Sequence, residues 1–264
     1  MKKVKAEALT SSDFETRKPK ILFWDLENSP NVGYSWGKWQ QDIIEFVDEW
    51  RLLSFSVKWQ GGKQITKCLA DYEGYDASNP NDEQLVTELW SYLNDADILI
   101  GHNGDRFDRR KAYTRFVELG LPPPQPSKTV DTLKQARKHF AFNSNKLDDL
   151  GRRLGVGRKV QTGGFQLWRD CMAGDERAWS RMKKYNAADV RLLEAVYNRM
   201  LPYMTAHPNL NVLTNREIGC PKCGDSNIQH RGFHYTATGK SRRYQCQGCM
   251  GYSTGKHIKT TEVR

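Results

Sequence analysis

Two carboxylates at the end of an apolar run are the residues of this chain that point most directly to chemistry. The run covers residues 21–24, and Asp25 and Glu27 follow it with one residue between them. If the run is a buried strand, residues two apart point to the same face of the sheet, so both carboxylates face the same way. Buried carboxylates repel one another until a metal ion neutralises them, so the pair indicates a site for hard cations.

Three further residues could complete such a site. Asp108 follows a second apolar run at 97–103 and lies at the start of a predicted helix. Tyr185 and Asp189 lie four positions apart on a strongly helical segment, so they share one face of that helix. Each motif occurs by chance in many proteins, but the joint pattern predicts two Mg²⁺ or Mn²⁺ ions that clamp a scissile phosphate. Zn²⁺ is less suited to a ligand set made only of oxygens.

The predicted secondary structure places these residues at strand ends and on a helix face. We expect strands at about 20–26, 51–59, 64–70, 97–102 and 128–131. We expect helices ending near 94 and at about 106–119, 132–139, 146–154 and 175–201. Strands that are followed by strand–helix alternation predict an α/β fold with a mixed sheet covered by helices.

The length and charge of the chain limit the class of protein to which it can belong. A chain of 264 residues is long enough for one sizeable domain and a small module, and its net charge of +10 favours a polyanionic partner. No apolar stretch approaches the roughly 20 residues that span a bilayer, and the first twenty residues lack the apolar core of a secretory signal. We therefore expect an intracellular protein, cytoplasmic or nucleoid-associated, that has no membrane partner and keeps its thiols reduced.

Four cysteines near the C-terminus form two CxxC pairs. They are Cys220, Cys223, Cys246 and Cys249, with 22 residues between the pairs. Four thiolates make a closed tetrahedral zinc site, so we expect one structural Zn²⁺ rather than a catalytic one. A module this small cannot build a sufficient core unaided, so metal binding would drive its folding.

The residues around these cysteines are basic. From Arg216 to Arg264, nine Lys and Arg residues stand against three Asp and Glu residues, a net charge of +6. Basic and aromatic residues alternate here, which favours nucleic-acid binding, although a protein-docking module is an alternative. The expected contacts are Arg231, Lys240, Arg242, Arg243 and Tyr244, with His234 and Tyr235 as stacking partners.

Taken together, these motifs resemble those of the DEDD 3′–5′ exonucleases of the ribonuclease-H-like fold, in the subclass that carries a tyrosine. The resemblance is greatest to the exonuclease domain of family B DNA polymerases and its free-standing relatives, and it covers roughly residues 19–205. It rests on FWDLE (23–27), GHNGDRFD (101–108), VDTLKQAR (130–137), NKLDDLGRRLGVGRK (145–159) and YNAAD (185–189). The cysteine segment resembles the zinc ribbons of some transposases.

The resemblance implies a role for each motif residue. It implies a five-stranded mixed sheet with flanking helices, and a tyrosine, Tyr185, that orients the attacking water. It also implies that the two metal ions are bound by four carboxylates, those of Asp25, Glu27, Asp108 and Asp189. Asn103 and Phe107 would hold the 3′-terminal nucleotide. We further expect nucleic-acid contacts from Leu26 and from Lys146, which begins a basic stretch that could equally be a solvated helix face.

Three other polar residues lie close to these motifs. We interpret Asp105 as solvated, Asp131 as a hydrogen-bonded structural residue and His102 as packing near a strand end.

The chain is thus predicted to contain a flexible leader at 1–18, an exonuclease domain at 19–205, a linker at 206–215 and a four-cysteine zinc ribbon at 216–260. We expect a metal-dependent 3′–5′ exonuclease that acts on single-stranded DNA with a free 3′ end. An RNA exonuclease, a structure-specific endonuclease of the same fold and a non-catalytic nucleic-acid-binding protein are the alternatives.

Overall fold

The computed structural model describes residues 18–39, 42–214 and 218–259. The described part of the chain divides into two compact units, of which one covers Lys20–Arg199 and the other begins at Met200. The predicted leader lies outside the described residues except for its last position, as do the end of the predicted linker and both ends of the predicted ribbon. The four predicted domain boundaries therefore stay predictions.

The unit Lys20–Arg199 is built on the five-stranded mixed sheet that the sequence predicts. The strand order is β5–β4–β1–β6–β7, in which β1 pairs antiparallel with β4 and parallel with β6. The strands are β1 (Ile21–Asn28), β4 (Leu52–Trp59), β5 (Gln64–Cys68), β6 (Ile98–Gly101) and β7 (Lys128–Asp131). The central position of β1 explains its apolar run, because a strand between two neighbours is covered on both faces.

Helices cover the sheet, and most of them agree with the predicted ranges. They are η2 (Leu69–Asp71), α1 (Glu83–Asp95), α2 (Asp108–Glu118), α3 (Thr132–His139), α4 (Leu147–Arg153), α5 (Gln166–Met172) and α6 (Glu176–Met200). The sequence did not predict α5, which has only seven residues, or a separate hairpin of β2 (Val32–Tyr34) and β3 (Glu45–Asp48). None of the helices in the described part of the chain is long and apolar enough to cross a membrane.

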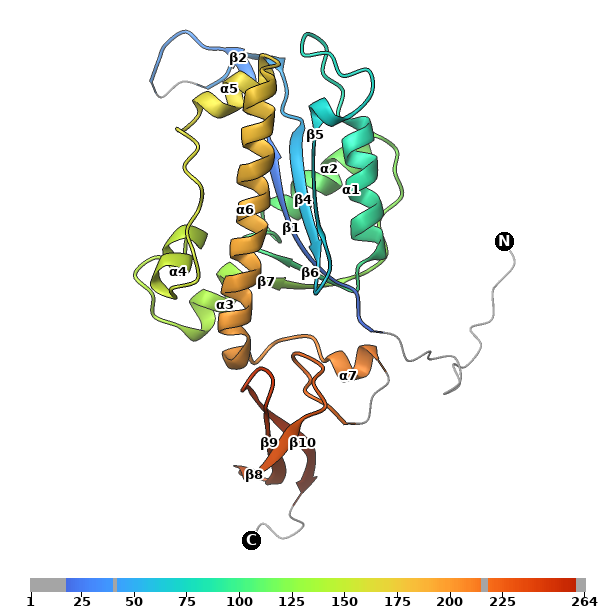
Figure 1. The fold of residues 1–264 in the computed structure, drawn as a ribbon, viewed down its shortest axis with the longest axis vertical. Helices are drawn as coiled ribbons and strands as arrows, with labels where there is room; N and C mark the ends of the chain where they lie inside the picture. Colours follow the sequence, from blue (N-terminus) through green and yellow to red (C-terminus); the bar gives the residue numbers. More distant parts are fainter. Residues whose placement is uncertain (1–17, 40–41, 215–217, 260–264) are drawn as a thin grey trace, which may run out of the picture. The chain divides into compact units, whose positions relative to one another are not determined.

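The alternation of side chains along β1 decides what each face of the sheet contacts. Leu22, Trp24 and Leu26 belong to the apolar core that also contains the buried leucines of α1. Phe23 points the other way and packs edge-on against Tyr197 of α6, with ring centroids 5.3 Å apart. Figure 1 shows α6 running along the sheet on the side opposite α1. Because residues two apart share a face, the acids that follow Phe23 along β1 point toward α6.

The second unit contains a three-stranded antiparallel sheet in the order β10–β9–β8. Its elements are η3 (Leu201–Tyr203), α7 (Leu210–Leu213), β8 (Ile228–Thr236), β9 (Gly239–Cys246) and β10 (Tyr252–Lys259). Nearly all side chains of β8 are exposed, so this sheet has little apolar core of its own. Such a module needs a further source of stability.

The contact between β1 and α6 can be tested by truncation. Phe23 is fully buried, so Phe23→Ala should lower the free energy of unfolding by about 3–5 kcal/mol, the cost of emptying a large aromatic site. Val117 on α2 is 78% exposed, and Val117→Ala should change it by less than about 0.5 kcal/mol. Denaturant unfolding measures both, and equal effects would contradict the packing described here.

Candidate active site

The structure brings three of the predicted acids together. Asp25 and Glu27 lie on β1 opposite Ser56 and Ser54 of β4, and Asp189 approaches them from α6. One carboxylate oxygen from each acid lies within 4.8 Å of the others. Residues separated by more than 160 positions in the sequence thus share one small volume between the sheet and α6.

Asp108 stands beside this cluster rather than within it. It is the first residue of α2 and is 5% exposed, and its Oδ1 accepts a hydrogen bond of 3.2 Å from the backbone N–H of Leu26. Leu26 lies between the two acids of β1, so this bond holds the carboxylate of Asp108 at the same end of the strand. Its charge acts directly on Asp25.

Burial and mutual repulsion make the charged form of this group costly. Burial, followed by the charges of the neighbouring acids, raises the pKa of Asp25 well above its usual range. Burial likewise raises the pKa of Glu27 to about 8 and that of Asp108 to about 7. Burial also raises the pKa of Asp189, against the opposing effect of a nearby ammonium. These shifts are those expected for a buried cluster of acids, whose charged forms a bound cation would favour.

That ammonium belongs to Lys159, which the sequence placed in a basic stretch outside the site. Its Nζ donates to Asp189 Oδ2 at 2.6 Å and to the hydroxyl of Tyr185 at 3.2 Å. Burial lowers the pKa of Lys159, but the surrounding acids outweigh this and raise it, so the side chain is charged. This contact could not be predicted from the sequence, because the segment between α4 and α5 has no regular structure.

Asn186 is a second residue that the sequence did not identify. Its side-chain Nδ2 donates to Asp25 Oδ2 at 2.7 Å, and its Oδ1 accepts from Ser54 Oγ at 3.0 Å. It is fully buried, so these bonds fix the position of α6 against β1 and β4. Asn186 lies within the motif YNAAD (185–189), but the sequence pattern assigned no role to it.

One further observation indicates that these acids are suited to bind a divalent cation. Asp189 Oδ1 is buried and has no hydrogen-bond partner among the described residues. A buried carboxylate oxygen is costly unless it is paired, and a cation coordinated by oxygens would satisfy it. The ligand set of the cluster is composed only of carboxylate oxygens, which suits Mg²⁺ or Mn²⁺.

Tyr185 lies on the same face of α6, one turn before Asp189. Its ring packs edge-on against Trp168 of α5, with centroids 6.0 Å apart. Burial, together with nearby acids, raises the pKa of Tyr185, so the phenol keeps its proton at neutral pH and can donate it in a hydrogen bond.

The residues predicted to contact nucleic acid near this site differ in exposure and in their contacts. Phe107 is 44% exposed just before α2, whereas Leu26 is 4% exposed within the apolar core. Asn103 has a left-handed backbone (φ 64°), and its N–H donates to Asp131 Oδ1 at 2.9 Å. Lys146 is exposed and lines a cavity of about 670 Å³. Lys159, Asn103, His102 and Arg137 also line that cavity.

The structure shows the contacts of the three polar residues close to the motifs, Asp131, His102 and Asp105. Asp131 accepts from the backbone N–H groups of Leu133 and Asn103, which confirms that it is a hydrogen-bonded structural residue. His102 contacts the hydroxyl of Thr132 at 2.9 Å, and burial lowers its pKa to about 4, so its ring is neutral. The interpretation of Asp105 as solvated was wrong: its side chain is 17% exposed and forms an ion pair with Lys134 at 2.6 Å. Lys134 lies on α3, beyond α2 and β7 in the chain, so the sequence alone does not reveal it as the partner of Asp105.

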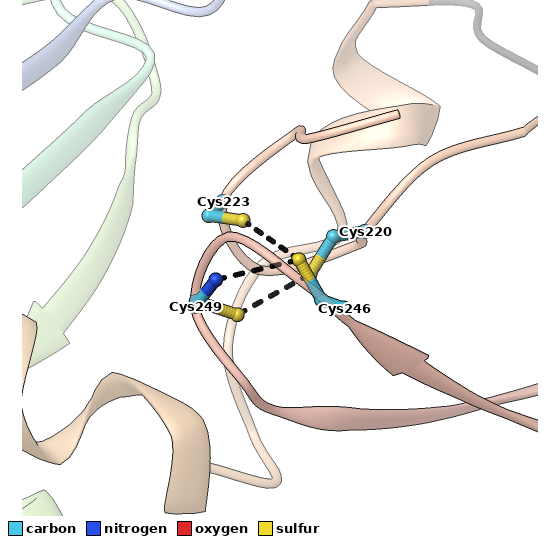
Figure 2. A group of neighbouring side chains, drawn as sticks. All are labelled: Cys220, Cys223, Cys246 and Cys249. Atoms are coloured by element: carbon cyan, nitrogen blue, oxygen red, sulfur yellow. Dashed lines mark hydrogen bonds between the residues drawn. The ribbon is translucent and has the colours of Figure 1, made fainter. Parts of the chain in front are cut away.

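The four cysteines converge in the second unit. Cys220 Sγ lies 3.6 Å from Cys249 Sγ, and Cys223 Sγ lies 3.5 Å from Cys246 Sγ. Figure 2 shows all four sulfurs turned toward a common centre. The contact between Cys220 and Cys223 lowers the pKa of Cys220 and raises that of Cys223, because the two sulfurs share one proton. The four sulfurs lie within 4.8 Å of one another, so the cluster is compatible with the tetrahedral zinc site of a zinc ribbon.

The basic residues predicted to contact nucleic acid in this unit do not form one group. Arg242 and Tyr244 lie on one face of the three-stranded sheet, because alternate residues of β9 share a face. Arg231 and Arg243 lie on the other face, where Arg243 Nε donates to the backbone oxygen of Arg231 at 2.9 Å. Their contacts with nucleic acid stay a prediction.

A sequence model described as the RNase H superfamily matches residues 53–201, more than half of the chain. The chain belongs to the RNase H superfamily. This confirms the predicted fold class, a mixed five-stranded sheet covered by helices, although β1 precedes the matched residues. No curated protein matches the sequence significantly.

The fold of this RNase H superfamily member is similar to a solved structure of a family B DNA polymerase from the hyperthermophilic archaeon Pyrobaculum calidifontis. The two share 14% sequence identity with a TM-score of 0.50, and the match covers 84% of this chain. It covers only 32% of the polymerase chain, so this chain corresponds to about a third of that protein. At this identity the likeness concerns the fold.

The raised pKa values predict how stability depends on pH. The protons that Glu27 and Asp108 hold in the folded state are lost as the pH rises through about 7–8, whereas the unfolded chain loses them near pH 4. Without added Mg²⁺ or Mn²⁺, the melting temperature should therefore fall by about 8–16 °C between pH 6 and pH 9, since the two shifts together correspond to about 4 kcal/mol. Thermal unfolding of protein that holds stoichiometric zinc measures this.

The double variant Glu27→Gln/Asp108→Asn supplies the control. It carries no titrating group at either position, so its melting temperature should depend less on pH. Added Mn²⁺ should remove most of the wild-type dependence and less of the variant's, because the variant keeps only Asp25 and Asp189 as ligands. Identical pH profiles of the two proteins would contradict the assignment of these shifts.

Proposed function

We propose that this protein is a metal-dependent nuclease that removes nucleotides from the 3′ ends of single-stranded DNA. The observation that carries the proposal is the convergence of Asp25, Glu27 and Asp189, with Asp108 held beside them by the backbone of β1. RNase H superfamily membership supports a nuclease. The direction of degradation rests on the resemblance of the complete acid and tyrosine set to 3′–5′ exonucleases.

The four acids would hold the catalytic cations. Bound Mg²⁺ or Mn²⁺ would lower the pKa of a coordinated water and neutralise charge on the scissile phosphate. Asn186 keeps Asp25 oriented through its 2.7 Å hydrogen bond, so the acid on the strand and the acid on the helix stay in register. Bound cations would offset the cost of gathering these charges in one place.

Two further side chains would act on the reacting groups. Tyr185 is a neutral phenol next to the acid cluster, so it can orient an attacking water by donating or accepting a hydrogen bond. Lys159 places a positive charge within 2.6 Å of Asp189, where it can attract the phosphate of an incoming strand.

The cavity beside Lys159 supports an unpaired strand as substrate. It is lined by the basic residues Arg137 and Lys146 as well as by Asn103, and its volume of about 670 Å³ is comparable to that of a few nucleotide-sized groups. We infer that Asn103 and the exposed ring of Phe107 contact the terminal nucleotide. The phosphates of the following nucleotides would meet the basic wall.

The four-cysteine cluster would hold one structural zinc ion, and the zinc ribbon would add affinity for nucleic acid. The small sheet of this unit has little apolar core, so the metal would supply much of its stability.

Removal of the acids tests the catalytic proposal. Asp25→Ala and Asp189→Ala should each abolish Mg²⁺- or Mn²⁺-dependent shortening of a 5′-labelled oligonucleotide, because each removes a ligand of the cations. Tyr185→Phe should retain activity reduced by about 10²-fold, the usual contribution of a group that positions a proton. Gel analysis of stepwise products over time measures these rates.

Glu73→Gln, an exposed acid outside the site, is the matched control and should keep full activity. Full activity of the double variant Asp25→Ala/Glu27→Ala would end the proposal. Matched linear DNA, linear RNA and circular DNA substrates decide among the alternative nucleases: cleavage of circular DNA would indicate an endonuclease, and a preference for RNA would indicate an RNA exonuclease.

Metal analysis tests the ribbon. The purified protein should contain about one zinc per chain. Cys223→Ser/Cys249→Ser should lose it, because only two of the four thiolates remain. The double variant Cys68→Ala/Cys171→Ala, which removes the two buried thiols outside the cluster, should keep it. Equal zinc content in both double variants would rule out the proposed ligands.

A further inference from the structure

One face of the three-stranded sheet gathers aromatic and basic side chains that no core encloses. We call it the aromatic face. Its rings come from β8 and β9, and its two basic residues come from β9. Its members are His230, Phe233, Tyr235, Lys240, Arg242 and Tyr244.

The register of β8 and β9 places these residues side by side. His230 pairs with Tyr244, and Tyr235 pairs with Lys240. His230 and Phe233 are three positions apart, so in a regular strand they would point to opposite faces. The register shifts between them, and Gly232 there has φ +75°, the left-handed conformation found in bulges of this kind. The bulge returns Phe233 to the face of His230.

The rings form a continuous, accessible row. The centroids of His230 and Phe233 are 5.5 Å apart, those of His230 and Tyr244 are 6.0 Å apart, and those of Phe233 and Tyr235 are 6.3 Å apart. Lys240 Nζ lies 5.1 Å from the centroid of Phe233. Tyr235 is 70% exposed and Phe233 is 36% exposed. Rings so accessible add little to the folding of the unit, so their function lies in what they contact.

The charge of the unit limits the choice of partner. Between residues 218 and 259 there are seven Lys and Arg residues and one Asp. A zinc ion bound by four thiolates carries a net charge of −2, so the unit stays positive when it is loaded. A partner that offers both flat rings and regularly spaced negative charges meets this surface best, and single-stranded nucleic acid does so. A duplex hides the faces of its bases in its own stack and could use only the charges.

The opposite face of the sheet differs in a way that permits a control. There Arg231 bonds to Gln229 Oε1 at 2.8 Å, and the guanidinium of Arg243 lies 5.9 Å from the centroid of Tyr252. These basic groups are engaged within the sheet, and Tyr252 is 52% exposed. The sequence grouped Arg231 and Arg243 with the other contacts, and the structure divides them.

We propose that the aromatic face binds unpaired bases by stacking, with Lys240 and Arg242 against the phosphates, and so anchors single-stranded nucleic acid on the zinc ribbon. This rests on the proposed function only for the choice of nucleic acid as partner. The face acts on the strand independently of the acid cluster and selects single strands over duplexes.

Binding by the full-length, zinc-loaded chain tests the inference. Asp189→Asn is introduced to prevent cleavage, and fluorescence anisotropy follows a labelled 20-nucleotide oligothymidine and a duplex of equal length. Phe233→Leu/Tyr235→Leu should weaken binding to the single strand at least tenfold, since each base stacked on an aromatic ring contributes about 1–3 kcal/mol. Its binding to the duplex should change less than twofold.

Tyr252→Leu, on the opposite face, is the matched control and should leave both affinities within twofold. Zinc content is measured for each variant, so that the loss of bound zinc is not mistaken for the loss of a binding contact on the aromatic face. The inference is overturned if the Phe233/Tyr235 variant binds the single strand as the parent does, or if Tyr252→Leu weakens binding equally. If the face docks a protein instead, the Phe233/Tyr235 variant should bind the single strand as the parent does.

Cleavage of the 5′-labelled oligonucleotide by the wild-type protein, measured alongside these affinities, separates the two proposals. If the wild-type protein cleaves nothing but binds through this face, the proposed function fails and this inference stands. If cleavage is present and the face does not bind, the reverse holds.

Discussion

Electrostatic repulsion at the end of β1 is the constraint around which the Lys20–Arg199 unit is organised. Asp25 and Glu27 face Asp189 across a narrow gap, and burial raises the cost of charging each of them. Without compensating partners, the repulsion between these carboxylates would push them apart or leave them protonated. The unit holds them together with the amide of Asn186 and the ammonium of Lys159, which are fixed donors rather than water.

The sheet holds the carboxylates close together against this repulsion. One face of β1 is committed to the apolar core under α1, and the other begins with Phe23 against α6 and continues into the acids. The same alternation therefore anchors the helix and aims the carboxylates. Any movement of α6 along the sheet would change the packing of Tyr197 and the distance from Asp189 to the strand together. Stability and site geometry are coupled through one helix.

Local periodicity accounts for what could be predicted. The two-residue spacing of Asp25 and Glu27 on a strand and the four-residue spacing of Tyr185 and Asp189 on a helix are properties of regular structure, and the sheet and most helices followed from similar patterns. The two CxxC pairs have spacings that metal chemistry alone explains. These features needed no knowledge of tertiary contacts.

The features that were missed depend on tertiary contacts or on irregular backbone. Lys159 reaches Asp189 from a segment without regular structure, and the role of Asn186 depends on Ser54, 132 positions away. Asp105 was judged solvated because its partner Lys134 lies on another element. The hairpin of β2 and β3 is short and largely exposed, so it lacks the apolar alternation by which strands are recognised.

The bulge at Gly232 makes the spacing of β8 matter more than most of its individual residues. Adding or deleting one position there would turn the outer half of the strand over, so that Phe233 and Tyr235 would leave the side on which His230 lies. Substitutions along the strand alter single rings, whereas a change in its length would dismantle the whole row at once. Insertions and deletions should therefore be far less tolerated in β8 than replacements of its exposed side chains.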